Sequence, residues 1–275
     1  MVATPIGNLA DLTLRAIHVL ARVDAVAAED TRVAGRLLAH LGLSKPLIPL
    51  HAHNERAGAE AVRARLAAGD AVAYVSDAGT PAVSDPGARL VAMVAAGGHK
   101  VVPVPGPSSV LAALSAAGDT LGQGYRFVGF LPSKGSERRA ALERALGERD
   151  TLVLFEAPHR IVDLAEALAT NVPQRRITLA RELTKQFESI TTMEAAALPA
   201  WLAADEQRRR GEFVLVLHAL PAPAAAGLAA DAERVLGILL RELPLKQAVA
   251  IAAEISGAAR NDLYERALAL RASQG

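Results

Sequence analysis

Apolar residues in the first 117 positions follow two alternating patterns. Short runs of consecutive apolar residues alternate with longer stretches in which apolar residues recur every three or four positions. The first pattern is typical of buried strands and the second of amphipathic helices. We therefore predict an α/β domain with a mostly parallel sheet over residues 1–117. Its strands are expected at residues 2–4, 25–29, 46–51, 71–77 and 100–106, and its helices at 12–23, 31–42, 55–69 and 88–98.

Longer apolar runs indicate a second α/β unit over residues 118–220. The segment 117–124, rich in small residues, is the expected hinge between the two units. Residues 221–230 (PAPAAAGLAA) are typical of a linker, and two or three helices follow it to complete a small module over 221–275. The strands of the second unit are expected at 125–132, 150–158, 175–183 and 212–220, and its helices at 136–148, 160–171 and 193–211.

Composition excludes several classes of protein. The chain has 275 residues, 51% of them hydrophobic, a formal charge of +1 and no cysteine. Disulfides, thiolate catalysis and cysteine-bound metals are therefore excluded. Aromatic residues make up 3% of the chain, which argues against the extensive stacking surface common in single-strand nucleic-acid binders. With no signal-peptide pattern and no apolar run long enough for a membrane span, the chain is expected to be cytoplasmic, without membrane contact.

Small and polar residues follow every strand predicted in the first domain. The segments are TPIGNLAD, EDTR, HAHNE, SDAGTPAVSDPG and PGPSS. Ligands of open parallel sheets bind beyond the carboxyl ends of the strands, so this edge is the expected site. Five ordinary turns would explain the glycines and prolines, but not the charged residues beside them. Since the standard pyrophosphate-binding motifs are absent, a ligand of nucleoside and amino-acid character is favoured, such as S-adenosylmethionine.

Individual residues at this edge suit such a ligand. Asp77 can accept hydrogen bonds from hydroxyls or an amine, and Gly79 and Gly106 allow close approach to the backbone. Ser108 and Ser109 begin a helical stretch, whose N-terminus favours a carboxylate.

Metal binding and serine catalysis are not favoured. His51 and His53 lie two positions apart and precede Glu55, which is barely enough for a metal site on a loop. Without another histidine-rich segment, hydrogen bonding to substrate or backbone is the better interpretation. No G-x-S-x-G motif follows a strand, so a serine nucleophile is not indicated either.

Eight segments together resemble one family in order and spacing. They are TPIGNLADLTLRA, AAEDTR, LHAHNE, VSDAGTPAVSDPG, PVPGPSS, GFLP, ARELTK and RRRGEFVLV. The chain is similar to the tetrapyrrole methylases, the class III S-adenosylmethionine-dependent methyltransferases, over nearly its whole length. TPIGN stands where porphyrin methylases carry a GPGD-type loop, so the resemblance is to the ribosomal RNA branch. The family normally has more residues before TPIGN, so a short first strand or a later start than in the family is expected.

The resemblance implies two α/β domains with S-adenosylmethionine in the cleft between them, usually in a homodimer. It also implies a helix-turn-helix-like module at the C-terminus. The implied reaction is 2′-O-methylation of cytidine 1402 in the decoding centre of 16S rRNA, within the small ribosomal subunit. By motif, the implied cofactor-binding residues are Pro5, Asp77, Gly79, Thr80, Gly106, Ser108, Ser109, Phe155 (or Glu156) and Leu183.

A ribose hydroxyl is weakly acidic and must lose its proton as the new bond forms. Lys185 and Glu29 are the favoured bases, because a lysine beside a sulfonium can have its pKa lowered; Asp30 and Glu182 are further catalytic candidates. The competing interpretation is that Glu29 with Arg32, and Arg181 with Glu182, form structural ion pairs. The expected RNA-binding residues are Asn8, Arg32, His53, Asn54, Glu55 and Arg181, with Arg208 to Arg210, Lys134, Arg138 and Arg139 as further contacts.

Two other functions remain compatible with the sequence. One is a methyltransferase of the same fold that acts on a porphyrin or corrin, against which TPIGN and the C-terminal module argue. The other is a non-catalytic protein that binds S-adenosylmethionine. The charged residues of EDTR and RELTK argue against it, because a pure sensor needs only the cofactor loops.

Overall fold

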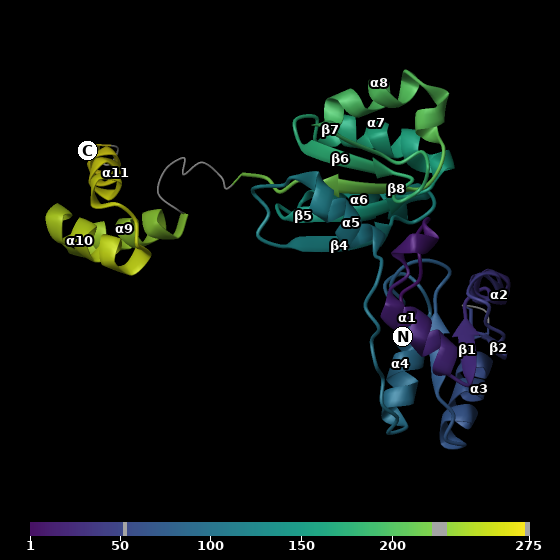
Figure 1. The fold of residues 1–275 in the computed structure, drawn as a ribbon. Coiled ribbons are helices and arrows are strands. Elements are labelled where there is room, and N and C mark those ends of the chain that lie inside the picture. The colour runs from purple at the N-terminus through teal and green to yellow at the C-terminus, as the bar shows by residue number, and fades with distance from the viewer. Residues whose placement is uncertain (52–53, 222–229, 273–275) are drawn as a thin grey trace. The chain divides into compact units, whose positions relative to one another are not determined.

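The computed structural model describes residues 1–51, 54–221 and 230–272 (Figure 1). The chain forms two compact units, Met1–Leu220 and Pro221–Gly275. The first unit contains two sheets and the second contains helices. The boundary expected between residues 117 and 118 lies inside the first unit and stays a prediction.

The first sheet has three parallel strands in the order β2-β1-β3. Its central strand is buried on both faces: Val26 and Ala28 belong to one apolar cluster with α1 and α2, whereas Ala25 and Ala27 belong to another with α3 and α4. This alternation is what a pleated strand between two helical layers requires. The elements are η1 (Leu9–Asp11), α1 (Leu14–Arg22), β1 (Ala25–Ala28), α2 (Thr31–His40), β2 (Leu47–Pro49), α3 (Glu55–Ala67), β3 (Val72–Val75), α4 (Gly87–Ala96) and α5 (Ser109–Ala117).

Two expected strands, at residues 2–4 and 100–106, are reduced to isolated bridges. Val2 pairs with Val104, and Thr4 pairs with Gly79. Pro103 and Pro105 flank Val104 and lack the N–H group that a continuous ladder needs, so no regular strand forms there. The bridges still fix the residues that lead into two loops at the carboxyl edge of the sheet.

The second sheet is mixed and has the strand order β4-β5-β8-β6-β7. β4 and β5 run parallel, and the remaining neighbours are antiparallel. Helices α6, α7 and α8 contribute to the core on one face, and α7 and α8 are seen stacked over the sheet in Figure 1. The elements are β4 (Tyr125–Phe130), α6 (Gly135–Leu146), β5 (Thr151–Glu156), η2 (Pro158–Arg160), α7 (Ile161–Asn171), β6 (Arg176–Arg181), β7 (Ser189–Glu194), η3 (Ala195–Ala197), α8 (Leu198–Ala203), η4 (Glu206–Arg209) and β8 (Phe213–Leu217).

The opposite face of this sheet is covered by α5, the helix that follows the last loop of the first sheet. Val110, Ala113 and Ala117 of α5 pack with Val153 and Val216 of the sheet. The helix therefore joins the two sheets and brings its N-terminus, at Ser108 and Ser109, to the strand ends of both.

The edge strand β7 was not anticipated. Met193 and Glu194 end this strand, although the sequence pattern placed them at the start of a helix. Buried and exposed positions alternate only weakly along β7, because an edge strand is partly exposed on both faces. Four of its six residues have intermediate burial. Its β-branched residues Ile190, Thr191 and Thr192 were the signal that favoured a strand.

The second unit contains three helices among its described residues. They are α9 (Ala230–Glu242), α10 (Leu245–Ser256) and α11 (Arg260–Ala272). Leu236, Val249 and Leu263, one from each helix, meet in its core. Most of the expected linker at 221–230 lies outside the described residues. None of the helices described in either unit has the length and apolar character needed to cross a membrane.

Candidate functional site

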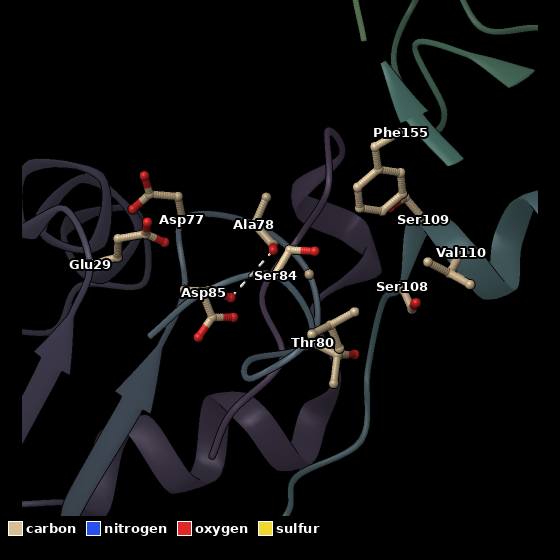
Figure 2. Close-up of a pocket in the computed structure, with 13 residues that line it drawn as sticks. Glu29, Asp77, Ala78, Thr80, Ser84, Asp85, Ser108, Ser109, Val110 and Phe155 are labelled. Carbon is tan, nitrogen blue, oxygen red and sulfur yellow. Dashed lines mark hydrogen bonds between the residues drawn. The ribbon is translucent and has the colours of Figure 1, made fainter. Parts of the chain in front are cut away.

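A cavity of about 160 Å³ opens beside the loop that follows β3. Three carboxylates, from Glu29, Asp77 and Asp85, lie on one side of it (Figure 2). Ser109 and Phe155 lie on the other side, so the N-terminus of α5 and the end of β5 complete the wall. The whole lining is Glu29, Ser76, Asp77, Ala78, Gly79, Thr80, Val83, Ser84, Asp85, Ser108, Ser109, Val110 and Phe155.

A larger cavity of about 420 Å³ adjoins the first and shares Ala78, Ser109 and Phe155 with it. Its walls are mainly apolar, and its volume lies in the usual range for small-molecule sites, about 300–1,000 Å³. One charged and one apolar compartment thus lie side by side. The larger cavity is lined by Ile6, Ala78, Ser109, Phe130, Phe155, Glu156, Ala157, Pro158, Leu183, Glu212, Phe213 and Val214.

The loop after β3 is held in shape by its own aspartate. Asp85 accepts hydrogen bonds from the backbone N–H groups of Ala82 (2.7 Å) and Gly87 (2.8 Å) and from the Tyr74 hydroxyl (3.2 Å). These bonds stabilise Ala82 at φ +70°, a left-handed conformation that is unfavourable for alanine. Thr80 donates to the Pro107 carbonyl (2.9 Å), which ties this loop to PGPSS.

Two glycines permit the close approach of neighbouring loops. Gly79 has φ +78° and exchanges two backbone hydrogen bonds of 3.0 Å with Thr4. A Cβ atom on Gly106 would lie 2.9 Å from the Cβ of Ala3, so a larger residue would push the loops apart. The loops that follow residues 4, 77 and 106 therefore form one packed unit at the sheet edge.

Glu29 is the carboxylate whose protonation is most altered within this cavity. Burial, together with the charges of Asp77 and Asp85, raises the pKa of Glu29, although a backbone hydrogen bond from Asp77 opposes the shift. Asp77 accepts a hydrogen bond from the Asp30 backbone N–H (2.9 Å). The arrangement concentrates negative charge where a cationic ligand group would be favoured.

Asp30 has a different role from its neighbour. Its carboxylate caps α2 through the Arg32 backbone N–H (2.8 Å) and pairs with the Arg32 guanidinium (2.6 Å). Hydrogen bonds to Arg32 hold the pKa of Asp30 well below its usual range. The competing interpretation paired Arg32 with Glu29, but the structure pairs Arg32 with Asp30. The Arg32 side chain remains 86% exposed.

Lys185 lies in a cluster of carboxylates. Its ammonium contacts Glu182 (2.9 Å) and Glu212 (3.0 Å). Burial lowers the pKa of Lys185, but the hydrogen bonds and charges of these two glutamates outweigh burial and raise it. The lowered pKa expected for a lysine beside the donor's sulfonium is therefore not found in the chain without the donor, and the catalytic role of Lys185 stays a prediction. Burial raises the pKa of Glu182, and the hydrogen bonds from Lys185 and from the Glu212 backbone overcome it, so the pKa is lowered.

The RELTK loop is strained and packed against TPIGN. Glu182 and Thr184 have φ of +52° and +66°. A Cβ on Gly7 would lie 2.4 Å from Cγ of Lys185 and 3.1 Å from the Leu183 carbonyl oxygen, so glycine is needed for this contact. Strain of this kind at non-glycine residues clusters at functional loops.

Arg181 does not pair with Glu182, which corrects the second ion pair suggested by the sequence. Its guanidinium donates to the carbonyls of Arg210 (3.1 Å) and Phe187 (3.2 Å) and to the Ser189 hydroxyl (3.3 Å). Arg181 therefore links three segments of the chain. Several of its N–H groups are already hydrogen-bonded, so fewer remain to bind RNA.

Three further substrate-binding predictions, Asn8, Asn54 and Glu55, are not among the lining residues of either cavity. Asn54 accepts from the His51 backbone N–H (2.8 Å) and donates to the Pro49 carbonyl (3.0 Å), so it shapes its own loop. Glu55 pairs with Arg89, and Asn8 caps η1 through the Ala10 N–H. His53 lies outside the described residues.

Of the predicted catalytic and cofactor residues, most come together at the cavities. Glu29, Asp77, Gly79, Thr80, Ser108, Ser109 and Phe155 line the first cavity, and Ser109, Phe155, Glu156 and Leu183 line the second. Pro5, Gly106, Asp30, Glu182 and Lys185 are not among the lining residues of either cavity.

Sequence reasoning missed several lining residues. Asp85 carried a usable signal, because an aspartate before Pro-Gly at a helix start is typical of a turn that its side chain stabilises. Ile6, Phe130 and Val214 carried none, since they join the site only through folding. Among the described residues, no group of three or more histidine, aspartate or glutamate side chains is placed to hold a metal.

Comparison with known proteins decides the family. The family described as Tetrapyrrole (Corrin/Porphyrin) Methylases matches residues 1–199. The chain belongs to this family. Residues 219–271 match the domain described as the RsmI C-terminal HTH domain, which covers the second unit. The tetrapyrrole methylase fold and the C-terminal module that the sequence predicted are thereby confirmed.

Full-length relatives narrow the branch within the family. The chain is 48% identical to Ribosomal RNA small subunit methyltransferase I of Pseudomonas aeruginosa, covering 98% of this chain and 95% of the relative. It is 48% identical to the protein of the same name from Escherichia coli O157:H7, covering 98% and 93%. The resemblance to the ribosomal RNA branch is confirmed.

A solved structure shares the fold at much lower identity. The uroporphyrin-III C-methyltransferase of Thermus thermophilus, complexed with S-adenosylhomocysteine, has a TM-score of 0.53 and 19% identity, covering 78% of this chain and 94% of that one. At this identity the likeness establishes the fold alone.

Proposed function

We propose that this tetrapyrrole methylase transfers a methyl group from S-adenosylmethionine to ribosomal RNA of the small subunit, at the ribose 2′-hydroxyl of a cytidine, 1402 of 16S rRNA. The names of the 48% identical relatives support the substrate class. The observation that carries the proposal is the pair of adjoining cavities, one lined by carboxylates and one by apolar side chains.

The residues of the two cavities fit S-adenosylmethionine. The apolar walls at Ile6, Leu183 and Val214 suit an adenine ring. Asp77 at the strand end and the backbone of Gly79 suit ribose hydroxyls or an ammonium group, and the N-terminus of α5 at Ser108 suits a carboxylate. The negative charge of the smaller cavity complements the sulfonium, which supplies an activated methyl group when bound.

Glu29 is the residue best placed to accept the proton of the ribose hydroxyl. Its carboxylate lines the smaller cavity, and its raised pKa makes it a stronger base than an ordinary glutamate. Lys185 carries a raised pKa and two carboxylate partners, so it stays protonated and is a poor base. We assign Lys185 and Glu182 to holding the RELTK loop against TPIGN.

The chain's contribution to rate is mainly positioning. Holding two reactants in line converts a bimolecular step into an effectively unimolecular one. The loops around Asp77 and Gly106 are fixed by Asp85, by the Thr80–Pro107 hydrogen bond and by the Thr4–Gly79 pairing. Their rigidity means that little reorganisation accompanies the reaction.

On the substrate side, the exposed Arg32 is the clearest phosphate contact near the smaller cavity. Its guanidinium is oriented by Asp30, and its side chain is 86% exposed, so it presents donors to solvent. The proposal also includes that the protein is cytoplasmic and acts as a homodimer on the small ribosomal subunit.

The test is mass spectrometry of 16S rRNA fragments from cells that lack this gene, before and after the gene is restored. Loss and recovery of a ribose methyl at the proposed cytidine is the expected result. A methyl group that persists in the deletion strain would contradict the RNA assignment. Transfer of tritium from labelled donor to uroporphyrinogen rather than to small ribosomal subunits would favour the porphyrin alternative. Binding of the donor with no transfer to either would indicate a sensor.

A further inference from the structure

Four of the five phenylalanines of this chain gather at one place. The sequence contains five phenylalanines, and Phe130, Phe155 and Phe213 line the larger cavity. The rings of Phe127 and Phe130 both contact Phe155 edge-on, at 5.0 and 5.4 Å between centroids. Phe155 and Phe213 are partly or fully buried, whereas Phe130 is 56% exposed. The low aromatic content therefore does not exclude a local stacking surface.

A bulge in β4 turns Phe130 toward the cavity. Residues three apart on a regular strand point to opposite faces. In β4 the pairing shifts between Phe127 and Gly129, which leaves Val128 unpaired, and Gly129 has φ +71°. Phe127 and Phe130 consequently pair with residues two apart on β5 and share one face.

Two arginines contact the backbone directly after Phe130 and are oriented by one buried carboxylate. Glu156 has a side chain that is 0% exposed and contacts Arg138 (2.8 Å) and Arg160 (3.0 Å). Arg160 also donates to the carbonyls of Leu131 (2.7 Å) and Pro132 (3.2 Å), directly after Phe130. Each arginine side chain is 17% exposed.

The charge of this cluster is unbalanced in favour of a bound anion. Two guanidinium groups share one carboxylate, which leaves an excess of one positive charge. Lys134 and Arg139 of the same loop and helix start are exposed, and neither pairs with a carboxylate in the part of the chain that the structure describes.

We propose that Phe130, Arg138 and Arg160 form a nucleotide subsite beside the methyl-transfer cavity. One unpaired base of the RNA stacks on the exposed face of Phe130, and its phosphate binds the two arginines. Single-stranded RNA is recognised through such stacking on aromatic rings and through phosphate contacts. The inference rests on the proposed function and extends it by naming residues of the second sheet that hold the RNA.

The first arm of the test is Phe130→Ala and Phe130→Trp, assayed on small ribosomal subunits that lack the methyl group. The alanine variant is expected to lower kcat/KM for the subunits about tenfold or more, because one stacked base is lost, and the tryptophan variant to retain it. Because Phe130 lines the cavity assigned to the donor, the affinity for S-adenosylmethionine is measured by calorimetry in both variants, and in the alanine variant it should fall much less than kcat/KM. Tyr125→Ala, an exposed aromatic at the opposite end of β4, is the matched control and should behave as wild type.

The second arm is the salt dependence of subunit binding in Arg138→Gln and Arg160→Gln. Each loss of a phosphate contact should reduce the slope of log K against log salt by about 0.7. Arg126→Gln removes an exposed arginine that pairs with Glu148 and should leave the slope unchanged. If a glutamine variant is unfolded, Arg138→Lys keeps the charge, and it should lower affinity without changing the slope.

Three results separate the inference from the proposed function. Wild-type protein that does not methylate the subunits overturns both. Wild-type activity with normal kcat/KM in Phe130→Ala overturns the inference alone. A loss of donor affinity equal to the loss of kcat/KM assigns Phe130 to the cofactor and also overturns it.

Discussion

The two sheets of the first unit offer opposite chemistry at the strand ends that line the cavities. The ends of β1 and β3 present the carboxylates of Glu29 and Asp77. The ends of β4 and β5 present an exposed phenylalanine and a carboxylate covered by two arginines. The acidic edge suits a cationic donor and a proton acceptor, whereas the basic, aromatic edge suits RNA. The comparison shows that negative charge gathers at the strand ends of the first sheet, and an aromatic ring with two arginines at those of the second.

The largest expected effect is on the acidic edge. Glu29→Gln removes the proton acceptor while keeping the shape of the side chain, so kcat should fall by about 10²–10⁴-fold. Donor affinity should change little, and a kcat assay with calorimetric donor binding separates the two. Because the pKa of Glu29 is raised, wild-type kcat should increase with pH through that pKa, and the increase should be absent in the variant. If Lys185→Gln lowered kcat more than Glu29→Gln does, Lys185 rather than Glu29 would be the proton acceptor.

The second prediction concerns the basic edge. Glu156→Gln leaves Arg138 and Arg160 without their buried counter-charge, so the free energy of unfolding should fall by about 3–5 kcal/mol. Chemical denaturation measures the change. Glu60→Gln, in an exposed pair with Arg63, is the control and should cost less than about 1 kcal/mol. Equal effects in the two variants would mean that burial of Glu156 does not matter for stability.

The third prediction concerns the contact between the TPIGN loop and the RELTK loop. Gly7→Ala places a Cβ 2.4 Å from Lys185 and 3.1 Å from the Leu183 carbonyl, so TPIGN and RELTK must separate. Overpacking of this kind costs about 1–3 kcal/mol, and donor affinity should weaken because Ile6 and Leu183 line the larger cavity. Gly124→Ala meets no atom within 4 Å and should leave both quantities unchanged.

The acidic edge was far more predictable from sequence than the basic edge. Asp77, Gly79, Thr80, Ser108 and Ser109 lie in short motifs directly after expected strands, so the fold class alone brought them to one place. The triad of Arg138, Glu156 and Arg160 joins two strand ends and two helix starts, and the stagger of a bulge decides where Phe130 points. No periodicity in the sequence encodes those pairings.

The same limit explains the errors in local chemistry. The pKa of Lys185 is lowered by burial and raised by Glu182, three positions away, and also by Glu212, which is distant in sequence and reaches it only through the turn before β8. Regular elements with full burial, such as β5 and β8, followed directly from their apolar runs. Elements shaped by missing donors or partial exposure, such as residues 100–106 and β7, did not.

The smallest expected effect lies at the segment between the two sheets. Asp119 accepts hydrogen bonds from Thr151 Oγ1 (2.7 Å) and the Ala219 N–H (2.8 Å), and it lies 4.0 Å from His218. Burial lowers the pKa of His218; Asp119 opposes this shift, and the charges of Arg175 and Arg176 add to it.

A histidine with a lowered folded pKa stays neutral in the fold while the unfolded chain takes up a proton. Stability should therefore fall as pH decreases below about 6.5, by at most about 1.4 kcal/mol per pH unit. Burial raises the pKa of Asp119, but its hydrogen bonds prevail and lower it, so its contribution is lost only at more acidic pH, below about 3.8. His218→Gln should flatten the melting temperature between pH 6.5 and 5 relative to wild type. An unchanged pH profile in this variant would show that His218 does not couple to folding.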